Sequence, residues 1–248
     1  MTYDVITHAR RTTRRRATVL CLVTATVLGA AAVVVACGTG PDRPSTSSSS
    51  PVLVRPETTV DSRAVLPDDL DWVDIAGVSV PVSKRSGPLF LSEGRARGFA
   101  HNPGGAVLAA VHIVIRVNPQ VGPAVYDPTL RTQVVGADAA AMLDQVERAY
   151  EELRNQAGAA DGQPVGRLNA TLLGYRILSY SDDEAALRLL TEAPDGSGSS
   201  LMVSTEVGVR WTGSDWALLA PAGGTFDKAV TVALDPYAAM FLPFSAGR

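Results

Sequence analysis

The sequence predicts an α+β fold, in which about three helices come first and a curved antiparallel sheet follows. Residues 98–117 and 138–156 carry apolar residues at helical spacing. From Leu201 to Trp211, apolar residues alternate with mostly polar or small ones, as in a half-buried strand. We expect the helices to cover the concave face of the sheet.

A basic and then apolar N-terminus precedes this domain. Residues 1–16 contain five arginines and one acidic residue, and residues 17–36 contain no charge. About 20 apolar residues suit a membrane-spanning helix or an export signal. Because basic residues stay inside, the chain after Cys37 should lie outside. We therefore expect a cytoplasmic tail over 1–16 and a transmembrane anchor or lipoprotein signal over 17–37.

Cys37 distinguishes two forms of membrane attachment. Small residues precede it in residues 34–38 (VVACG), which resembles the signal at which a cysteine receives a lipid. The long basic region and the length of the apolar segment favour an uncleaved anchor instead. Both alternatives place the protein at the cell membrane, single-pass with the main domain outside or lipid-anchored on the outer face.

Residues 38–68 are rich in serine, threonine and proline, which predicts a disordered linker to a domain spanning 69–248. The chain has 22 basic and 25 acidic residues; residues 1–38 hold five and one, which leaves 17 and 24. This acidic balance argues against a domain that binds nucleic acid directly. Both cysteines, Cys21 and Cys37, lie in the apolar segment or at its end, so the domain has no disulfide and no thiolate metal site.

The domain begins with two predicted short strands, at 72–75 and 78–82, and Pro81 restricts the second to a sheet edge or an extended arm. A loop over 84–88 follows. A buried helix over 103–116 is then expected to organise the core. Its apolar part of about a dozen residues is shorter than the roughly 20 needed to cross a bilayer.

The ends of the helices have recognisable signals. Asn102 and Pro103 are typical of a helix start, and Asn118–Pro119 stops the first helix. A short second helix is predicted over Pro128–Val135. The third is capped by Asp138, runs to about Gln156 and stops at Gly158.

Four strands are predicted after the third helix, followed by a C-terminal tail whose aromatic residues pack onto the domain. The two turns are rich in Asp, Ser and Gly, and the second forms a hairpin. The strands cover 169–180, 185–191, 201–211 and 216–219, the turns cover 181–183 and 212–215, and the aromatic tail is Phe241–Phe244.

The order of elements resembles the nuclear transport factor 2-like superfamily, a cone of helices against a curved sheet. Its membrane-tethered members include periplasmic scaffold proteins of type IV secretion systems and related conjugation proteins of Gram-positive bacteria. Over about residues 72–220 the sequence also resembles an uncharacterised actinobacterial envelope family. The stretches that carry the resemblance are Val80–Ser83 with Gly87–Pro88, Gly98–Ala106, Gly122–Val125, and Val209–Trp211 with Asp215–Leu218.

This resemblance implies an extracytoplasmic scaffold for DNA transfer or export, with no catalytic residues. Its partners would be the membrane, other envelope proteins and further copies of the chain. The alternative function is a small-ligand-binding lipoprotein or sensor with a pocket in the open end of the cone. Converging polar side chains beneath the first helix would favour this alternative, whereas a filling of valine, leucine and aromatic side chains would count against it.

A few residues are candidates for a pocket or an interface. His101 precedes the first helix, and Arg97, with Arg95, and Arg116 flank it as candidates to hold an anionic partner. The C-terminal end of a helix also favours Arg116 without any function. Trp211 and Trp216 lie near a hairpin tip, where a core layer is favoured over an interface.

The histidines predict neither a metal site nor catalysis. His101 and His112 are eleven residues apart, or about three helical turns, so they do not share a metal ion. His112 is expected near the core with one hydrogen bond. Neither an HExxH nor a GxSxG motif is present. We expect a non-enzymatic protein without cofactor or metal.

Overall fold

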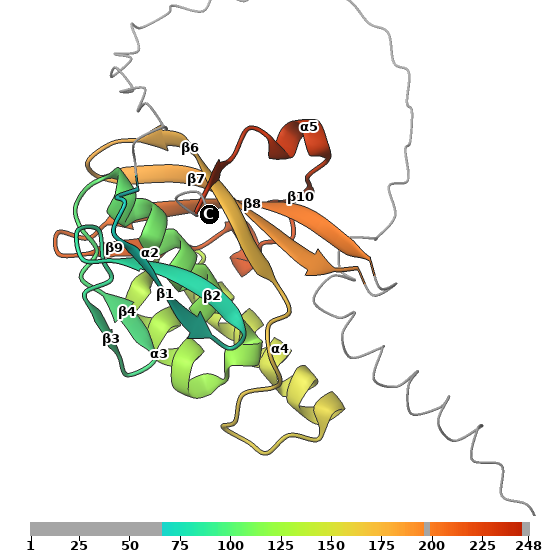
Figure 1. Ribbon diagram of the computed structural model, residues 1–248. Helices are drawn as coiled ribbons and strands as arrows, with labels where there is room; N and C mark the ends of the chain where they lie inside the picture. The colour runs from blue at the N-terminus through green and yellow to red at the C-terminus, as the bar shows by residue number, and fades with distance from the viewer. Residues whose placement is uncertain (1–65, 196–198, 245–248) are drawn as a thin grey trace, which may run out of the picture.

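Figure 1 shows the computed structural model, in which residues 66–195 and 199–244 are described. The predicted anchor, Cys37 and the linker up to residue 65 lie outside these ranges. Within them, no helix is both long and apolar enough to cross a membrane. The described chain has an α+β architecture, with three long helices, the short helix α5 and a seven-stranded sheet.

Helix α2, Pro103–Arg116, has the predicted bounds. The Asn102 side chain accepts a hydrogen bond from the Gly105 amide at 2.8 Å, which confirms the predicted cap. The residues from Gly104 to Ile113 are all buried, so the helix is enclosed around its circumference rather than along one stripe. A helix that is apolar on all faces is typical of such a central position.

The other two long helices confirm the prediction in part. Helix α4, Ala139–Ala157, ends at Gly158 in the left-handed conformation as expected, but Asp138 forms no side-chain cap. Helix α3, Pro123–Gln133, begins five residues before the predicted start. Gly122, with φ of 86°, turns the chain so that Pro123 occupies the first turn. The predicted helical end at Val134–Val135 is wrong, because these residues form strand β5.

The main sheet has the order β11–β6–β7–β8–β9–β5, and β10 also pairs with β8. All neighbours are antiparallel except β5 and β9. The predicted β8–β9 hairpin is confirmed, with Trp211 opposite Trp216. The bounds are β5 Val134–Val135, β6 Thr171–Tyr180, β7 Glu184–Pro194, β8 Ser200–Trp211, β9 Trp216–Leu219, β10 Val230–Val232 and β11 Leu242–Pro243.

Two hairpins precede α2. Strands β1, Leu70–Ile75, and β2, Val78–Ser83, form the first one as predicted. The second hairpin joins β3, Phe90–Ser92, and β4, Arg95–Arg97, and was not predicted. Its turn residues Glu93 and Gly94 have φ of 53° and 74°. Two positive φ values characterise the turn that suits a tight hairpin, but glutamate is an unusual residue there, so the sequence signal is weak.

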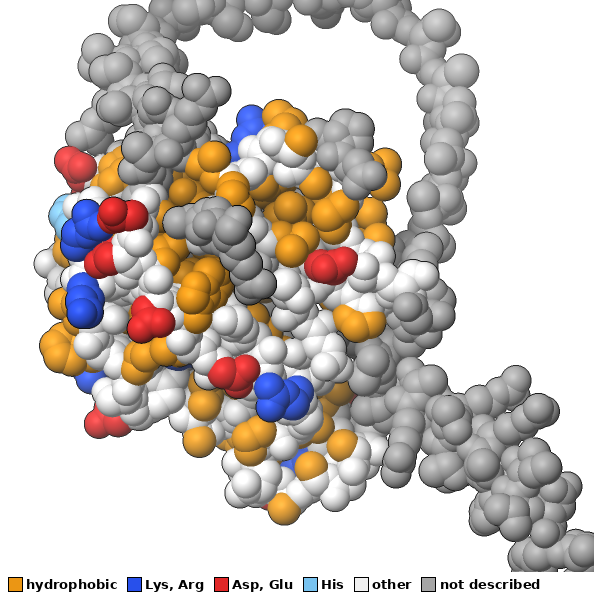
Figure 2. Space-filling model, viewed as in Figure 1, with side chains coloured by type: hydrophobic (Ala, Val, Ile, Leu, Met, Phe, Trp, Pro, Cys, Tyr) orange, Lys and Arg blue, Asp and Glu red, His pale blue; other side chains and the backbone are white. Residues whose placement is uncertain are grey.

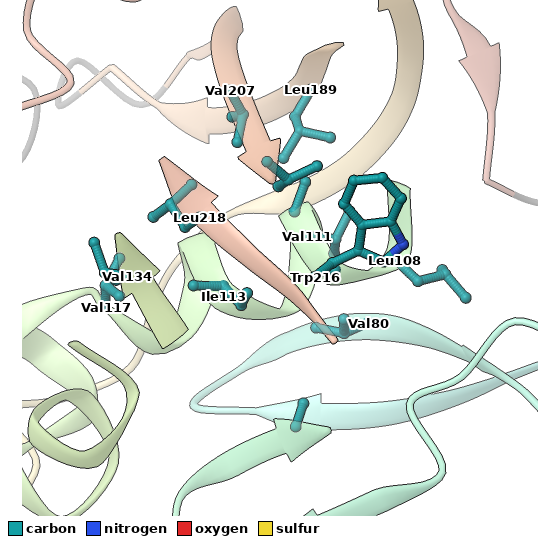
Figure 3. Close-up of a cluster of buried hydrophobic side chains, with 14 of the residues drawn as sticks. Val80, Leu108, Val111, Ile113, Val117, Val134, Leu189, Val207, Trp216 and Leu218 are labelled. Atoms are coloured by element: carbon teal, nitrogen blue, oxygen red, sulfur yellow. The ribbon is translucent and has the colours of Figure 1, made fainter. Parts of the chain in front are cut away.

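The main core lies between α2 and the sheet. Alternate residues of β7 and β8, including Leu189 and Val207, are buried and belong to the same cluster as α2. Figure 3 shows the side chains of α2 between those of the sheet and Val80 of β2. Valine, leucine and tryptophan therefore fill the space beneath α2.

The C-terminal tail covers part of the opposite face of the sheet. Leu190 of β7 packs there with Ala233 and Phe241 in a second, smaller cluster. Helix α5, Asp235–Ala238, lies on this side in Figure 1, away from α2. Phe241 and Phe244 are both buried, which confirms the predicted packing of the aromatic tail.

Candidate functional site

One end of the domain is built around residues 98–102, which lead into α2. The Asp215 carboxylate, in the β8–β9 turn, accepts hydrogen bonds from the amides of Gly98 at 2.7 Å and Phe99 at 3.1 Å. The Trp216 indole donates to the Ala100 carbonyl at 3.0 Å. Residues more than a hundred positions apart in sequence thus hold this loop against the end of the sheet.

His101 lies on the surface of this loop. Its ring stacks on Trp211, with centroids 4.0 Å apart and 8° between the planes, and the edge of Trp216 is 5.7 Å away. His101 Nε2 lies 2.5 Å from the Asp182 carbonyl oxygen. Because a carbonyl only accepts, Nε2 carries the proton.

Trp216 belongs to the core, as the sequence favoured, since its side chain is only 1% exposed. Trp211 is half-buried and covers one face of His101. His101 and Trp211 therefore form part of an exposed surface rather than the lining of an internal pocket. Sequence reasoning named both residues but gave no signal for their contact, because 110 positions separate them.

The three arginine candidates are not joined by any contact among the described residues. Arg97 is exposed and donates to the Ser92 hydroxyl at 3.4 Å. Arg95 pairs with Glu93 and lies 3.5 Å from the Thr132 hydroxyl. A shared site for an anion is not formed by these side chains, because Arg116 is buried in the core instead.

Arg116 and His112 form a buried pair within α2. Arg116 Nη1 donates to His112 Nδ1 at 2.8 Å and to the His112 carbonyl at 3.2 Å, and His112 Nε2 donates to the Pro81 carbonyl at 2.8 Å. Since a guanidinium only donates, Nδ1 must accept and the imidazole is neutral. His112 thus makes two hydrogen bonds, not the single one expected, and links α2 to β2.

Burial, with a smaller contribution from the neighbouring Arg116 charge, lowers the pKa of His112 to about 3. Burial also lowers the pKa of Arg116 to about 10. Both shifts follow from the low polarity of the surroundings, which disfavours the charged forms.

A surface of apolar side chains lies on the β3–β4 hairpin, beside the loop of residues 98–102. Leu89, Phe90 and Leu91 are 60%, 60% and 46% exposed. Leu89 and Phe90 lie directly against Gly98, within 3.2 Å of the position that a Cβ there would occupy. Figure 2 shows apolar side chains reaching the left edge of the molecule, where β3 and β4 lie in Figure 1.

We call Leu89, Phe90 and Leu91 the apolar edge. Sequence reasoning missed it. The available signal was a run of three large apolar residues between Pro88 and Ser92, too short and non-periodic to indicate an element. Within the described ranges, no group of three or more His, Cys, Asp or Glu residues is arranged to hold a metal ion.

A family model described as a domain of unknown function (DUF8175) matches residues 35–239. The chain belongs to this family. No curated protein and no solved structure matched the chain. The DUF8175 match includes Cys37, the apolar edge, the loop of residues 98–102 and both tryptophans of the β8–β9 hairpin, and it ends before the aromatic tail.

The buried imidazole predicts an acid-sensitive DUF8175 domain. The folded pKa of His112 lies below its unfolded value of 6.5, so the unfolded state binds the proton more readily. The contribution of neutral His112 to the free energy of unfolding is therefore complete above pH 6.5 and is lost as the pH falls toward 3. Between pH 6.5 and pH 5, protonation of His112 in the unfolded state should lower the free energy of unfolding by about 2 kcal/mol.

Urea denaturation of wild type and His112→Gln at several pH values measures this contribution. We expect His112→Gln to be less stable at pH 7, because its packing and bonds differ, but to have a shallower pH dependence below 6.5. Parallel pH profiles for the two proteins would contradict the assignment of the acid sensitivity to His112.

Proposed function

We propose that this protein is a non-enzymatic, membrane-tethered extracytoplasmic scaffold, acting as a component of a conjugative transfer or type IV-like secretion apparatus. The observation that carries the interaction role is the apolar edge. Soluble domains seldom expose several adjacent large apolar side chains unless a partner covers them. Tethering by residues 17–37, as an anchor or through a lipid on Cys37, belongs to the same proposal.

The apolar edge is held in place by the domain beneath it. The Gln133 side-chain amide donates to the Ala96 carbonyl at 2.6 Å, and the Leu89 amide donates to the Arg97 carbonyl at 2.9 Å. Gly94 approaches α3 so closely that a Cβ there would lie 2.3 Å from the Ala124 carbonyl oxygen. A surface fixed before binding loses less conformational entropy when a partner binds.

The finer fold assignment is also a proposal, namely a cone of the nuclear transport factor 2-like type. The order of three long helices before the long strands of a mainly antiparallel sheet, with α2 packed on β6–β9, supports it. In such a cone, the small-ligand alternative requires an open interior. The residues beneath α2, including Leu187, Val209 and Leu218, are buried and apolar, which does not favour that alternative.

Site-specific photocrosslinking in the native host tests the scaffold role. A photoreactive residue at position 91 should give adducts with envelope proteins or with a second copy of the chain. The same residue at Lys228, an exposed polar position on the C-terminal segment, is the control and should give none. Leu91→Ser should abolish co-purification of the same partner while changing stability by less than about 0.5 kcal/mol, because Leu91 is already exposed.

The absence of any adduct from position 91, together with a strictly monomeric full-length protein in light scattering, would contradict the proposal. Equal adduct yields from positions 91 and 228 would also contradict it, because they would indicate random collision rather than a defined interface.

A further inference from the structure

Helices α3 and α4, together with the loop that follows α4, line an acidic groove of about 720 Å³, which we call the α3–α4 groove. Tyr126 and Tyr150 contribute to its wall. Their rings pack edge to face with centroids 5.6 Å apart. The charged residues that line the groove are Asp127, Glu147, Arg148, Glu151, Glu152 and Asp161.

Internal ion pairs neutralise only part of this negative charge. Arg131 pairs with Asp127 at 2.7 Å and with Glu147 at 3.4 Å. Arg154 pairs with Glu151 at 2.6 Å and lies 3.9 Å from an Asp161 oxygen. Together with Arg148 these make three guanidinium groups against five carboxylates, so the groove keeps an excess of negative charge.

Besides its negative charge, the groove contains the hydroxyl of Tyr126, which is free to bind a ligand. The residue lines the groove and is only 4% exposed as a whole, its hydroxyl is not sealed from solvent, and no hydrogen bond joins that hydroxyl to the other described residues. Tyr150 differs, because its hydroxyl donates to the Gln163 carbonyl at 3.0 Å. Burial raises the pKa of Tyr126 to about 12, and the nearby Glu147 carboxylate contributes. The phenol therefore stays neutral, and its oxygen can accept a hydrogen bond from a ligand.

A ligand that only donates hydrogen bonds and carries positive charge fits these groups. An ammonium or guanidinium group can donate to the Tyr126 oxygen and to the carboxylates beside it. We propose that the α3–α4 groove binds a lysine or arginine side chain from an extended segment of a partner protein.

The exposure of the carboxylates favours an extended segment over a small free amine. The side chains of Glu147, Glu151 and Asp161 are 45%, 50% and 82% exposed. An exposed ion pair contributes only about 0–1 kcal/mol. Several cations spaced along one chain are therefore needed for useful affinity. This site uses residues distinct from the apolar edge, so its test does not depend on the scaffold proposal.

Fluorescence anisotropy tests the site with the full-length chain in neutral detergent and a fluorescein-labelled peptide of alternating lysine and glycine. Tyr126→Phe keeps every charge and removes one acceptor, so it should weaken binding about tenfold, the effect of losing one hydrogen bond to a charged group. Glu147→Gln combined with Glu152→Gln should weaken it at least as much. Asp182→Asn combined with Asp183→Asn removes the same charge from the exposed β6–β7 turn and should leave affinity unchanged.

Three results would overturn the proposal. Tyr126→Phe should fold normally, because the ring remains, so wild-type affinity in a variant with a wild-type melting temperature would show that the hydroxyl does not bind the peptide. An equal loss of affinity in the β6–β7 turn variant would indicate general attraction to an acidic protein. Spermidine binding as tightly as the peptide would assign the groove to a small amine instead of a protein segment.

Discussion

Val111→Asp should unfold the domain that contains α2. Val111 is fully buried near the middle of the helix, within the main core. An unpaired carboxylate in such a site costs several kcal/mol, and the lost valine packing adds to this. Because a domain is stable by only about 5–15 kcal/mol in total, the combined loss should remove most or all of its stability.

Circular dichroism and urea denaturation of the full-length chain measure this effect. Val232→Asp is the matched control, since Val232 is 42% exposed in β10 and the same new charge remains in water. We expect the control to melt close to wild type. A Val111→Asp protein with the same transition as the control would show that α2 is not the centre of the core.

The position of α2 was predictable because its signals are local. A cap at Asn102, a proline at the first helical position and a buried apolar sequence all agree. The β8–β9 hairpin was predictable for the same reason, since alternation and a polar turn lie within twenty residues. In contrast, the start of α3 depends on the positive φ of Gly122, and the sequence offered Pro128 as a competing start.

The surfaces of the domain were less predictable, because they depend on tertiary contacts. Asp215 is indistinguishable in sequence from any other turn aspartate, yet its carboxylate holds the amides of Gly98 and Phe99. Arg116 was a candidate to hold an anionic partner at the end of α2, but packing against β2 encloses it with His112. The unused hydroxyl of Tyr126 is equally invisible without the positions of α3 and α4.

Gly105→Ala should be the most disruptive of the conservative substitutions in α2. Alanine favours a helix by about 1 kcal/mol relative to glycine, so propensity alone predicts stabilisation. However, a Cβ at position 105 would lie 1.9 Å from the Ala100 carbonyl oxygen. That oxygen also accepts the Trp216 indole hydrogen bond, so the loop cannot move away without losing it. We expect the free energy of unfolding to fall by about 3 kcal/mol or more, at the upper end of the cost of overpacking.

Urea denaturation followed by tryptophan fluorescence reports on both stability and the surroundings of Trp216. Gly208→Ala is the control, because the three atoms nearest to its Cβ would all belong to the Leu219 side chain, whose closest atom, at 3.2 Å, can shift slightly. The free energy of unfolding of that variant should fall by less than about 1 kcal/mol. If Gly105→Ala were instead stabilised by the helix-propensity increment, the loop of residues 98–102 would have to be free to move. The surface formed by the apolar edge, His101 and Trp211 would then not be rigid before a partner binds.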